Sequence, residues 1–159
     1  MLYVDFFTRQ ILSFFRREGR GLPWRKEKIS AYEVWVSEIM LQQTQVERVL
    51  GYYRKFLKRF PTVRSLARAS WEDFLPYYSG LGYYNRGRNM LAAARRVAEH
   101  YRGRFPRDYD ALVSLPGVGD YTARAILSFA YGRNMLAPDT NVKKVLGRFF
   151  FGSRRADLN

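Results

Sequence analysis

The stretch of sequence that decides the fold is LPGVGDYTA, at residues 115–123. It joins a short helical pattern to a run, Tyr121 to Ala130, that predicts a second helix. Two glycines flank a small apolar residue there, and the chain can reverse tightly because glycine takes a positive φ at little cost. The free amides at the start of the second helix can hold a phosphate. The same pattern also serves a plain helix turn, and the motif alone leaves both interpretations open.

Composition points to a polyanionic partner. The 159 residues include 28 Lys and Arg against 14 Asp and Glu, a net charge of +14. A surplus of this size favours nucleic acid over a surface that is charged for solubility alone. A membrane partner is not expected, because no stretch approaches the about 20 apolar residues of a spanning helix. The charged N-terminus also argues against a secretory signal.

Metal and disulfide chemistry are limited by the residue types present. The chain has no cysteine and a single histidine, His100, whose polar neighbours predict a surface position. We therefore expect no disulfide and no metal site in this chain. The lack of cysteine fits a reducing compartment.

Helical periodicity runs through nearly the whole chain, and no segment alternates long enough to predict a strand. Ser70 has the sequence of an N-cap, with Asp73 as its reciprocal partner. The expected helices are residues 2–15, 31–50, 63–67, a short one after Ser70, 86–101, 110–115, 121–130 and 140–150. The predicted fold class is all-α, a bundle of short helices. Phe149 to Phe151 need a covering surface, either the Phe-rich first helix or something outside this chain.

Glu38 lies in the string SEIMLQQTQ, residues 37–45, within a helical pattern that is apolar on most faces. Burial there should raise the pKa of its carboxyl, and a general acid near neutral pH needs such a pKa. The alternative is a glutamate at the bundle edge, paired with Lys or Arg. Gln42, Gln43 and Gln45 are expected at a buried helix end, where nucleobase edges would satisfy their amides.

Asp139 stands where an N-cap belongs, ahead of the helix at residues 140–150. A structural cap is by far the commonest role for such a residue. A helix N-terminus also favours the ionised form of a carboxyl. Glu38 and Asp139 thus form a candidate pair of one protonated and one ionised carboxyl, the pattern used to cleave glycosidic bonds. The sequence alone does not show that they meet.

Tyr83 follows a glycine turn in GLGYYNR, residues 80–86, next to Arg86 and Arg88. Most tyrosines of this chain are expected in the core or at its boundary. A tyrosine at such a turn could instead stack on bases or wedge between them. Taken alone, the pattern favours the core position.

Five strings occur in one order along residues 22–148: LPWR, SEIMLQQTQV, GLGYY, LPGVG and DTNV. In this order they resemble the helix-hairpin-helix DNA glycosylases. The glutamine-rich string is similar to the A/G-specific adenine branch rather than to the endonuclease III or thymine-mismatch branches.

The resemblance implies two helical lobes with DNA and a flipped-out base between them. Residues 22–136 would form a six-helix barrel that contains the hairpin. Residues 1–21 would be the N-terminal helix of the second lobe, and residues 137–159 its Asp139 loop and first returning helix. This second lobe is incomplete, because relatives continue with more helices, and many add an iron–sulfur cluster on four cysteines and a domain that reads 8-oxoguanine. We expect a fragment, half of a split protein or a minimal variant, weakly active alone, whose Phe-rich helices bind the missing half or a second copy.

The resemblance also assigns roles to residues. Glu38 would protonate adenine at N7, and Asp139 would stabilise the positively charged sugar, with Tyr121 and Asn141 in support. The other implied sites are an adenine pocket at Trp24, Arg25 and Gln45, a probe of the DNA stack at Gln43 and Tyr83, and a phosphate-binding hairpin at Leu115, Gly117 and Gly119, with an alkali cation as its candidate cofactor. Asp120 should point away from the phosphate.

Tyr121 stands where the endonuclease III branch has a lysine that forms a Schiff base. A phenol cannot do so, and Arg124 nearby stays charged, so the resemblance implies a monofunctional enzyme. The expected partner is duplex DNA with a mismatched or oxidised base pair, in the cytoplasm on the nucleoid. The leading function is excision of adenine opposite guanine or 8-oxoguanine. The alternatives are a glycosylase for thymine opposite guanine and a non-catalytic DNA-binding module.

Overall fold

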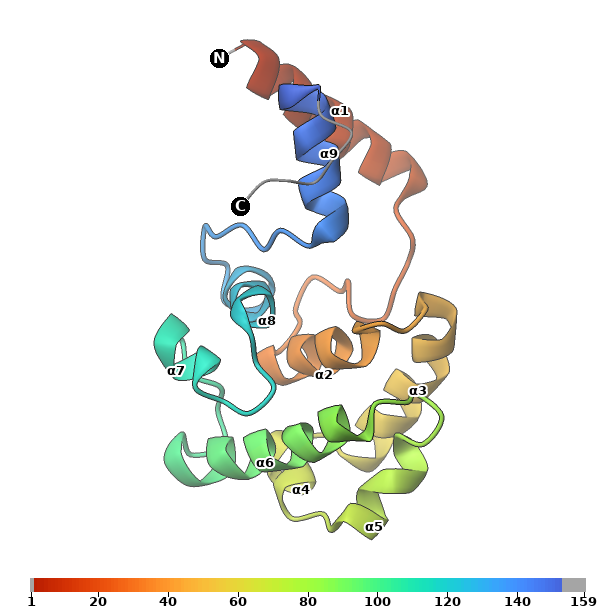
Figure 1. Ribbon diagram of the computed structural model, residues 1–159, viewed down its shortest axis with the longest axis vertical. Helices are drawn as coiled ribbons and strands as arrows, with labels where there is room; N and C mark the ends of the chain where they lie inside the picture. Colours follow the sequence, from red (N-terminus) through yellow and green to blue (C-terminus); the bar gives the residue numbers. More distant parts are fainter. Residues whose placement is uncertain (1, 153–159) are drawn as a thin grey trace.

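The computed structural model describes residues 2–152, and over that range the chain is helical, with no strand (Figure 1). The α-helices are α1 (Leu2–Glu18), α2 (Ala31–Leu41), α3 (Val46–Arg59), α4 (Val63–Ala67), α5 (Trp71–Phe74), α6 (Tyr84–His100), α7 (Tyr109–Val113), α8 (Asp120–Ala125) and α9 (Thr140–Phe151). A 3-10 turn follows α5 at Leu75–Tyr77, and a π-helical turn extends α8 at Ile126–Ala130. The all-α prediction is confirmed.

Helices α2 to α8 form a body, and α1 and α9 lie together beyond it as a two-helix arm (Figure 1). Helix α2 is central, because it packs against α3, α8 and the π-helical turn, while α6 packs on α4. Trp35, Phe56 and Phe74 are among the largest side chains of the core, and all three are fully buried. The expected boundaries at residues 21 and 136 stay predictions, and residues 153–159 of the last expected segment lie outside the described range.

Local sequence signals start several helices of the body. Ser70 and Asp73 form the reciprocal capping box predicted for α5, and Ser30 and Glu33 form another at the start of α2. Each such cap satisfies amides that a helix leaves free at its N-terminus, and contributes about 1 kcal/mol. These caps fix where α2 enters the body and therefore where its later residues lie.

The prediction of one helix over residues 31–50 is wrong. Helix α2 ends at Leu41 and α3 begins at Val46, because Gln43 has a φ of 54° and cannot continue a right-handed helix. Gln43 and Gln45 are exposed, so the expectation of glutamines at a buried helix end is also wrong. Both helices bury apolar residues, and the apolar pattern therefore runs across the break without marking it.

The arm is held by aromatic packing. The ring of Phe7 on α1 lies 4.5 Å from that of Phe149 and 5.2 Å from that of Phe150, measured between centroids. The first helix thus covers part of the phenylalanine cluster, as one alternative predicted. Other apolar side chains of the arm stay exposed, among them Tyr3, Val4, Phe6, Ile11, Leu12, Phe14, Phe15, Val145 and Phe151. Within residues 2–152, no helix combines the length and the apolar character that crossing a membrane requires.

Candidate active site

Glu38 is partly buried on α2, and its surroundings shift the balance of its carboxyl toward the protonated form. Burial raises the pKa of its carboxyl, a hydrogen-bonding contact from Tyr121 lowers it, and the nearby charge of Asp139 raises it, so that the pKa reaches about 6. Among the ion pairs of the described residues, none involves Glu38. The prediction of a raised pKa for Glu38 is confirmed. The alternative, an ion pair of Glu38 with Lys or Arg, is wrong for the described residues.

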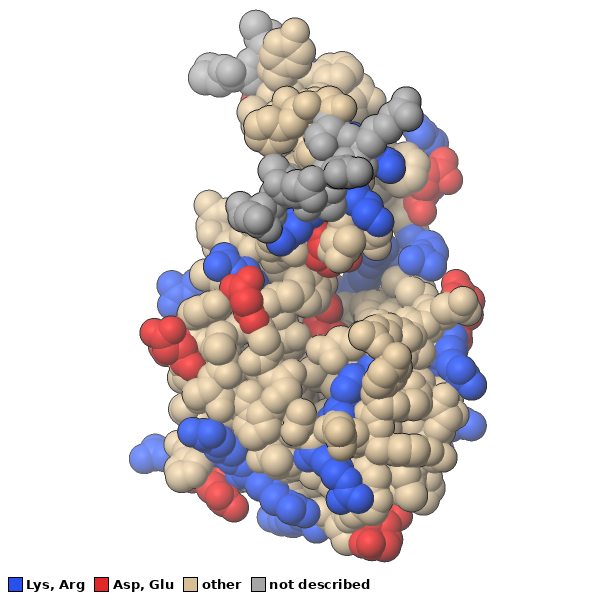
Figure 2. All heavy atoms as spheres, viewed as in Figure 1, with Lys and Arg blue, Asp and Glu red and all other residues tan. Residues whose placement is uncertain are grey.

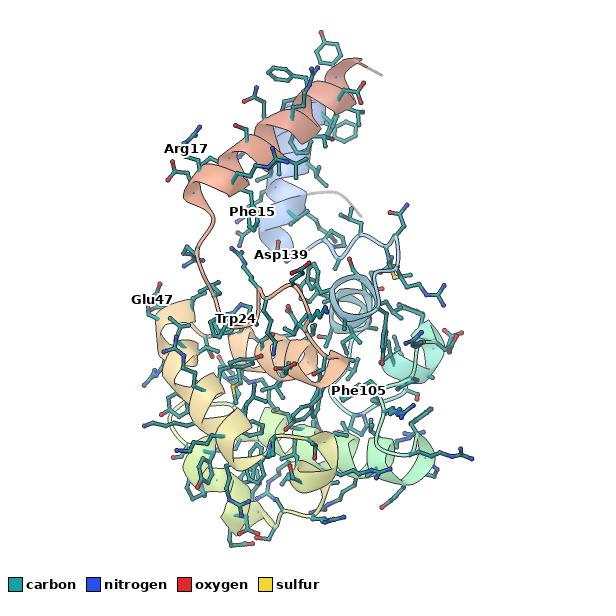
Figure 3. All side chains as sticks on the ribbon, turned by 180° about the vertical axis from the view of Figure 1, so that it is seen from behind. Phe15, Arg17, Trp24, Glu47, Phe105 and Asp139 are labelled. Atoms are coloured by element: carbon teal, nitrogen blue, oxygen red, sulfur yellow. The ribbon has the colours of Figure 1, made fainter. Side chains whose placement is uncertain are left out.

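Asp139 is the N-cap of α9. Its carboxylate accepts a hydrogen bond from the backbone N–H of Val142 at 2.7 Å, which confirms the predicted cap. The charge of Asp139 raises the pKa of Glu38, which lies on α2, and of Tyr121, which lies on α8. Three distant parts of the sequence therefore converge on one place. Figure 3 shows Asp139 where α9 meets the body, and Figure 2 shows the surface hollowed between the arm and the body.

Tyr121 completes this group from the first turn of α8. Burial raises the pKa of its hydroxyl, and the charges of Glu38 and Asp139 raise it further. The phenol therefore keeps its proton at neutral pH and can donate a hydrogen bond to either carboxylate. It cannot serve as an amine nucleophile.

The hairpin at residues 115–119 joins α7 to α8. Leu115 and Val118 are buried and anchor it in the body. Gly117 has a φ of 74°, and a Cβ there would come within 2.9 Å of the Cβ of Asn89. Gly119 has a φ of −92°, and a Cβ there would meet nothing within 4 Å. The expectation of a positive φ therefore holds for Gly117 only, and neither conformation nor packing requires glycine at position 119.

Asp120 begins α8 but its charge is already engaged. Its Oδ1 accepts hydrogen bonds of 2.6 Å from the hydroxyl of Tyr109 and from Nε of Arg124. These two contacts lower the pKa of the Asp120 carboxyl. The carboxylate is thus turned to α7 and to the next turn of its own helix, which leaves the Gly119 side of the hairpin free of its hydrogen bonds.

Three non-glycine residues of the body lie in the left-handed region: Gln43 with a φ of 54°, Tyr83 with a φ of 51° and, in the turn after α6, Arg102 with a φ of 53°. Such residues cost free energy and cluster at functional sites. Tyr83 is 62% exposed, so the core position that its pattern favoured is wrong. The guanidinium of Arg86, in the first turn of α6, reaches both the Gln43 and the Tyr83 turn. The sequence did not single out Arg86 beyond its place near Tyr83, and an arginine four residues after Gly82 was its one signal.

The remaining predicted residues, Trp24, Arg25, Gln45 and Asn141, are each placed by their own local contacts. Trp24 packs its ring edge-on against Tyr53 at 5.2 Å, and the Arg25 guanidinium lies 5.5 Å from the centre of the Phe15 ring. Gln45 is the N-cap residue of α3, and its side chain makes no capping hydrogen bond. Asn141 is exposed in the first turn of α9, two residues after Asp139. An adenine pocket built from these side chains stays a prediction.

A cavity of about 70 Å³ connects the Gln43 turn to the hairpin. Its lining comprises Trp35, Ile39, Gln42, Arg86, Asn89, Met90, Pro116 and Gly117. The end of α2, the first turns of α6 and the hairpin therefore share one side of the body. Basic side chains are spread over the visible face, with several along the edge of the body farthest from the arm (Figure 2).

The family model described as HhH-GPD superfamily base excision DNA repair protein matches residues 36–157, which include Glu38, the hairpin and Asp139. The chain belongs to this superfamily. Its HhH-GPD relatives include the adenine DNA glycosylase of Rattus norvegicus, 47% identical over 91% of this chain and 30% of that protein. The adenine DNA glycosylase of Mycobacterium tuberculosis is 41% identical over 92% of this chain and 48% of that protein.

Solved HhH-GPD structures are similar over nearly the whole chain. A thermostable thymine-DNA glycosylase superposes with a TM-score of 0.88 at 30% identity, over 99% of this chain and 72% of that one. An endonuclease III in a non-covalent DNA complex has a TM-score of 0.77 at 24% identity, over 91% of this chain and 66% of that one, which supports the fold alone. The chain spans less than half the length of the curated relatives described above.

Proposed function

We propose that this chain is the catalytic core of an adenine DNA glycosylase, which excises adenine opposite guanine or 8-oxoguanine from duplex DNA. The observation that carries the proposal is a partly buried acid, Glu38, with a pKa of about 6 beside the carboxylate of Asp139. At pH 7 such an acid is protonated in about one molecule in ten, about 30 times more often than an ordinary glutamate. Identities of 40–47% to adenine DNA glycosylases favour adenine as the base.

In this proposal the flipped-out nucleoside lies between the two carboxyls. Glu38 gives its proton to N7 of adenine, the bond from the sugar C1′ to N9 breaks, and its electron pair leaves with the base. Asp139 stabilises the positive charge that develops on the sugar, directly or as a covalent adduct that water then hydrolyses. The ionised Glu38 can take a proton from that water, which restores the starting state. The Tyr121 hydroxyl and Asn141 hold the carboxylate and the sugar in place.

The DNA contacts of the proposal lie on the side shared by α2, α6 and the hairpin. Gly119 brings backbone amides to an open surface, which suits a DNA phosphate and an alkali cation shared with it. Gln43 and Tyr83 probe the stack, and Trp24, Arg25 and Gln45 line the base. Residues 22–136 act as the barrel lobe and the arm as part of the second lobe. The protein works in the cytoplasm on the nucleoid.

Single-turnover release of free base tests the proposal. We expect this polypeptide to release adenine from duplexes with A opposite 8-oxoguanine or G, and to leave thymine opposite G intact. The Asp139→Asn variant should bind the same duplexes and release less than a hundredth as much adenine. No borohydride-trapped adduct should form, because Tyr121 offers no amine.

The same assay distinguishes the alternatives. Thymine release from a T:G duplex would favour the activity named for the 30% identical relative. Salt-dependent duplex binding that Asp139→Asn does not alter, with no base released by either protein, would identify a non-catalytic binding module.

A further inference from the structure

We infer that Arg86 is a positioning residue that clamps the two exposed turns into one preassembled DNA probe. The expected effect on adenine release rests on the proposed function. The hydrogen bonds of Arg86 to the two turns do not depend on that function. The two turns are residues 42–44, after α2, and residues 81–83, before α6. They are separated by about 40 residues of sequence, and one guanidinium spans both of them.

Both terminal nitrogens of the Arg86 guanidinium take part, and Nη2 contacts both turns. Nη1 donates to the carbonyl oxygens of Ile39, at 3.0 Å, and of Gln42. Nη2 donates to the carbonyl oxygen of Leu81 at 3.0 Å, with longer contacts to Thr44 Oγ1 at 3.4 Å and to the Gly82 carbonyl at 3.5 Å. A planar guanidinium fixes the angle between its donors, so these bonds also fix the angle between the turns.

The charge of Arg86 is balanced by these carbonyls. None of the ion pairs found among residues 2–152 involves it. Ile39 and Gln42 supply carbonyls at the C-terminal end of α2, where a helix carries partial negative charge and leaves its acceptors free. A partly buried cation needs such acceptors, so the guanidinium and the end of α2 hold each other in place.

The clamp holds the two exposed residues Gln43 and Tyr83 in their left-handed conformations. Gln43 and Tyr83 both have a positive φ, a conformation that persists only where surrounding contacts enforce it. Bonds to Gln42 and Thr44 flank Gln43, and bonds to Leu81 and Gly82 precede Tyr83. The Arg86 guanidinium also lies 5.3 Å from the centre of the Tyr83 ring, within cation–π range. One side chain therefore holds both left-handed residues.

Hydrogen exchange tests the clamp without DNA. The amide of Thr44 donates to Leu41 at 3.2 Å and that of Leu81 to Tyr78 at 3.1 Å, one in each turn. In Arg86→Met, which keeps the apolar stem, we expect both amides to exchange at least about tenfold faster while core amides of α2 stay unchanged. Arg86→Lys should fall between Arg86→Met and the natural protein.

Arg95→Gln is the matched control. Arg95 lies on the same helix and also donates to a carbonyl, that of Ala69 at 3.1 Å, but it faces away from both turns. Its substitution should leave the Thr44 and Leu81 amides as they are. The clamp is overturned if those two amides keep their exchange rates in Arg86→Met and Arg86→Lys, or if Arg95→Gln accelerates them equally.

Single-turnover adenine release tests the consequence. We expect Arg86→Lys to slow release at saturating DNA about tenfold or more, because small misplacements of a positioning group have large effects. Affinity for a fully paired duplex should change less than about twofold. In a Gln43→Ala, Tyr83→Ala background the same substitution should slow release by less than twofold, since the residues through which it acts are gone.

The outcomes separate the two proposals. Equal slowing of release in both backgrounds would show that Arg86 acts through general stability, which contradicts the clamp. If the natural chain releases no adenine while Arg86→Met accelerates exchange in both turns, the proposed function fails and the clamp stands.

Discussion

Glu38→Gln should make the protein more stable while it removes the proposed general acid. The pKa of Glu38 in the folded chain is about 6, raised from 4.5, so the folded state binds the proton more tightly than the unfolded state does. The contribution of Glu38 to stability is then fully present below pH 4.5 and is lost as the pH rises through about 6. A rise of this size corresponds to about 2 kcal/mol at neutral pH. Glutamine has nearly the same shape, carries no charge and can still accept from Tyr121.

Urea unfolding of both proteins at several pH values between 4.5 and 8 measures this effect. At pH 7.5 we expect Glu38→Gln to exceed the natural protein by about 2 kcal/mol, with the difference vanishing toward pH 4.5. Glu33→Gln on the same helix is the control of opposite sign. Burial raises the pKa of Glu33, but hydrogen bonds from Lys26 and Ser30 outweigh it and lower that pKa, so this variant should be less stable at neutral pH. A Glu38→Gln protein that is equally or less stable at pH 7.5 would refute the account of its burial.

Other variants test the remaining parts of the site. Tyr121→Phe should move the alkaline limb of the pH–rate profile upward by about one pH unit, because the contact that lowers the pKa of Glu38 is lost; a limb that stays or moves down would contradict it. Gly119→Ala should fold normally and bind duplex DNA about tenfold more weakly. Gly51→Ala, where a Cβ would also meet open space, should leave DNA binding unchanged. Equal DNA binding by the two variants would show that the hairpin does not contact DNA. Gly117→Ala should lower the midpoint of thermal unfolding, because its φ is 74°, and an unchanged midpoint would contradict the strain.

The parts of the fold that local chemistry controls were predictable from sequence. Ser70 with Asp73, and Asp139 before α9, act on amides within three residues of themselves, so their motifs predict the helix starts correctly. The break after Leu41 was not predictable. Gln43 is held in its left-handed conformation from outside its own segment, by an arginine on α6, and periodicity over a window of neighbours carries no trace of that contact.

The candidate site, too, was predictable from sequence only where neighbouring residues control it. A carboxyl in an apolar helix predicts a raised pKa, and this needs only the sequence around Glu38. Its distance from Asp139 depends on how α2, α8 and the start of α9 pack, which no motif encodes. The contribution of Tyr121, which lowers the pKa of Glu38, was likewise visible only once those elements were in place. Roles for Trp24 and Arg25 rest on the resemblance, since their contacts are with Tyr53 and Phe15.

Helix α2 joins the proposed chemistry to the proposed probe. Glu38 lies in the last turn of α2, and Gln43 follows in the turn two residues after the helix ends at Leu41. A rigid α2 is therefore needed for the proton donor and the probe to keep their separation. Trp35, Val36 and Met40 on α2 have no exposed surface, and each buried side chain of this kind contributes about 1.5–3 kcal/mol. The heavily packed core around α2 is thus what allows a destabilising acid to be kept where the chemistry requires it.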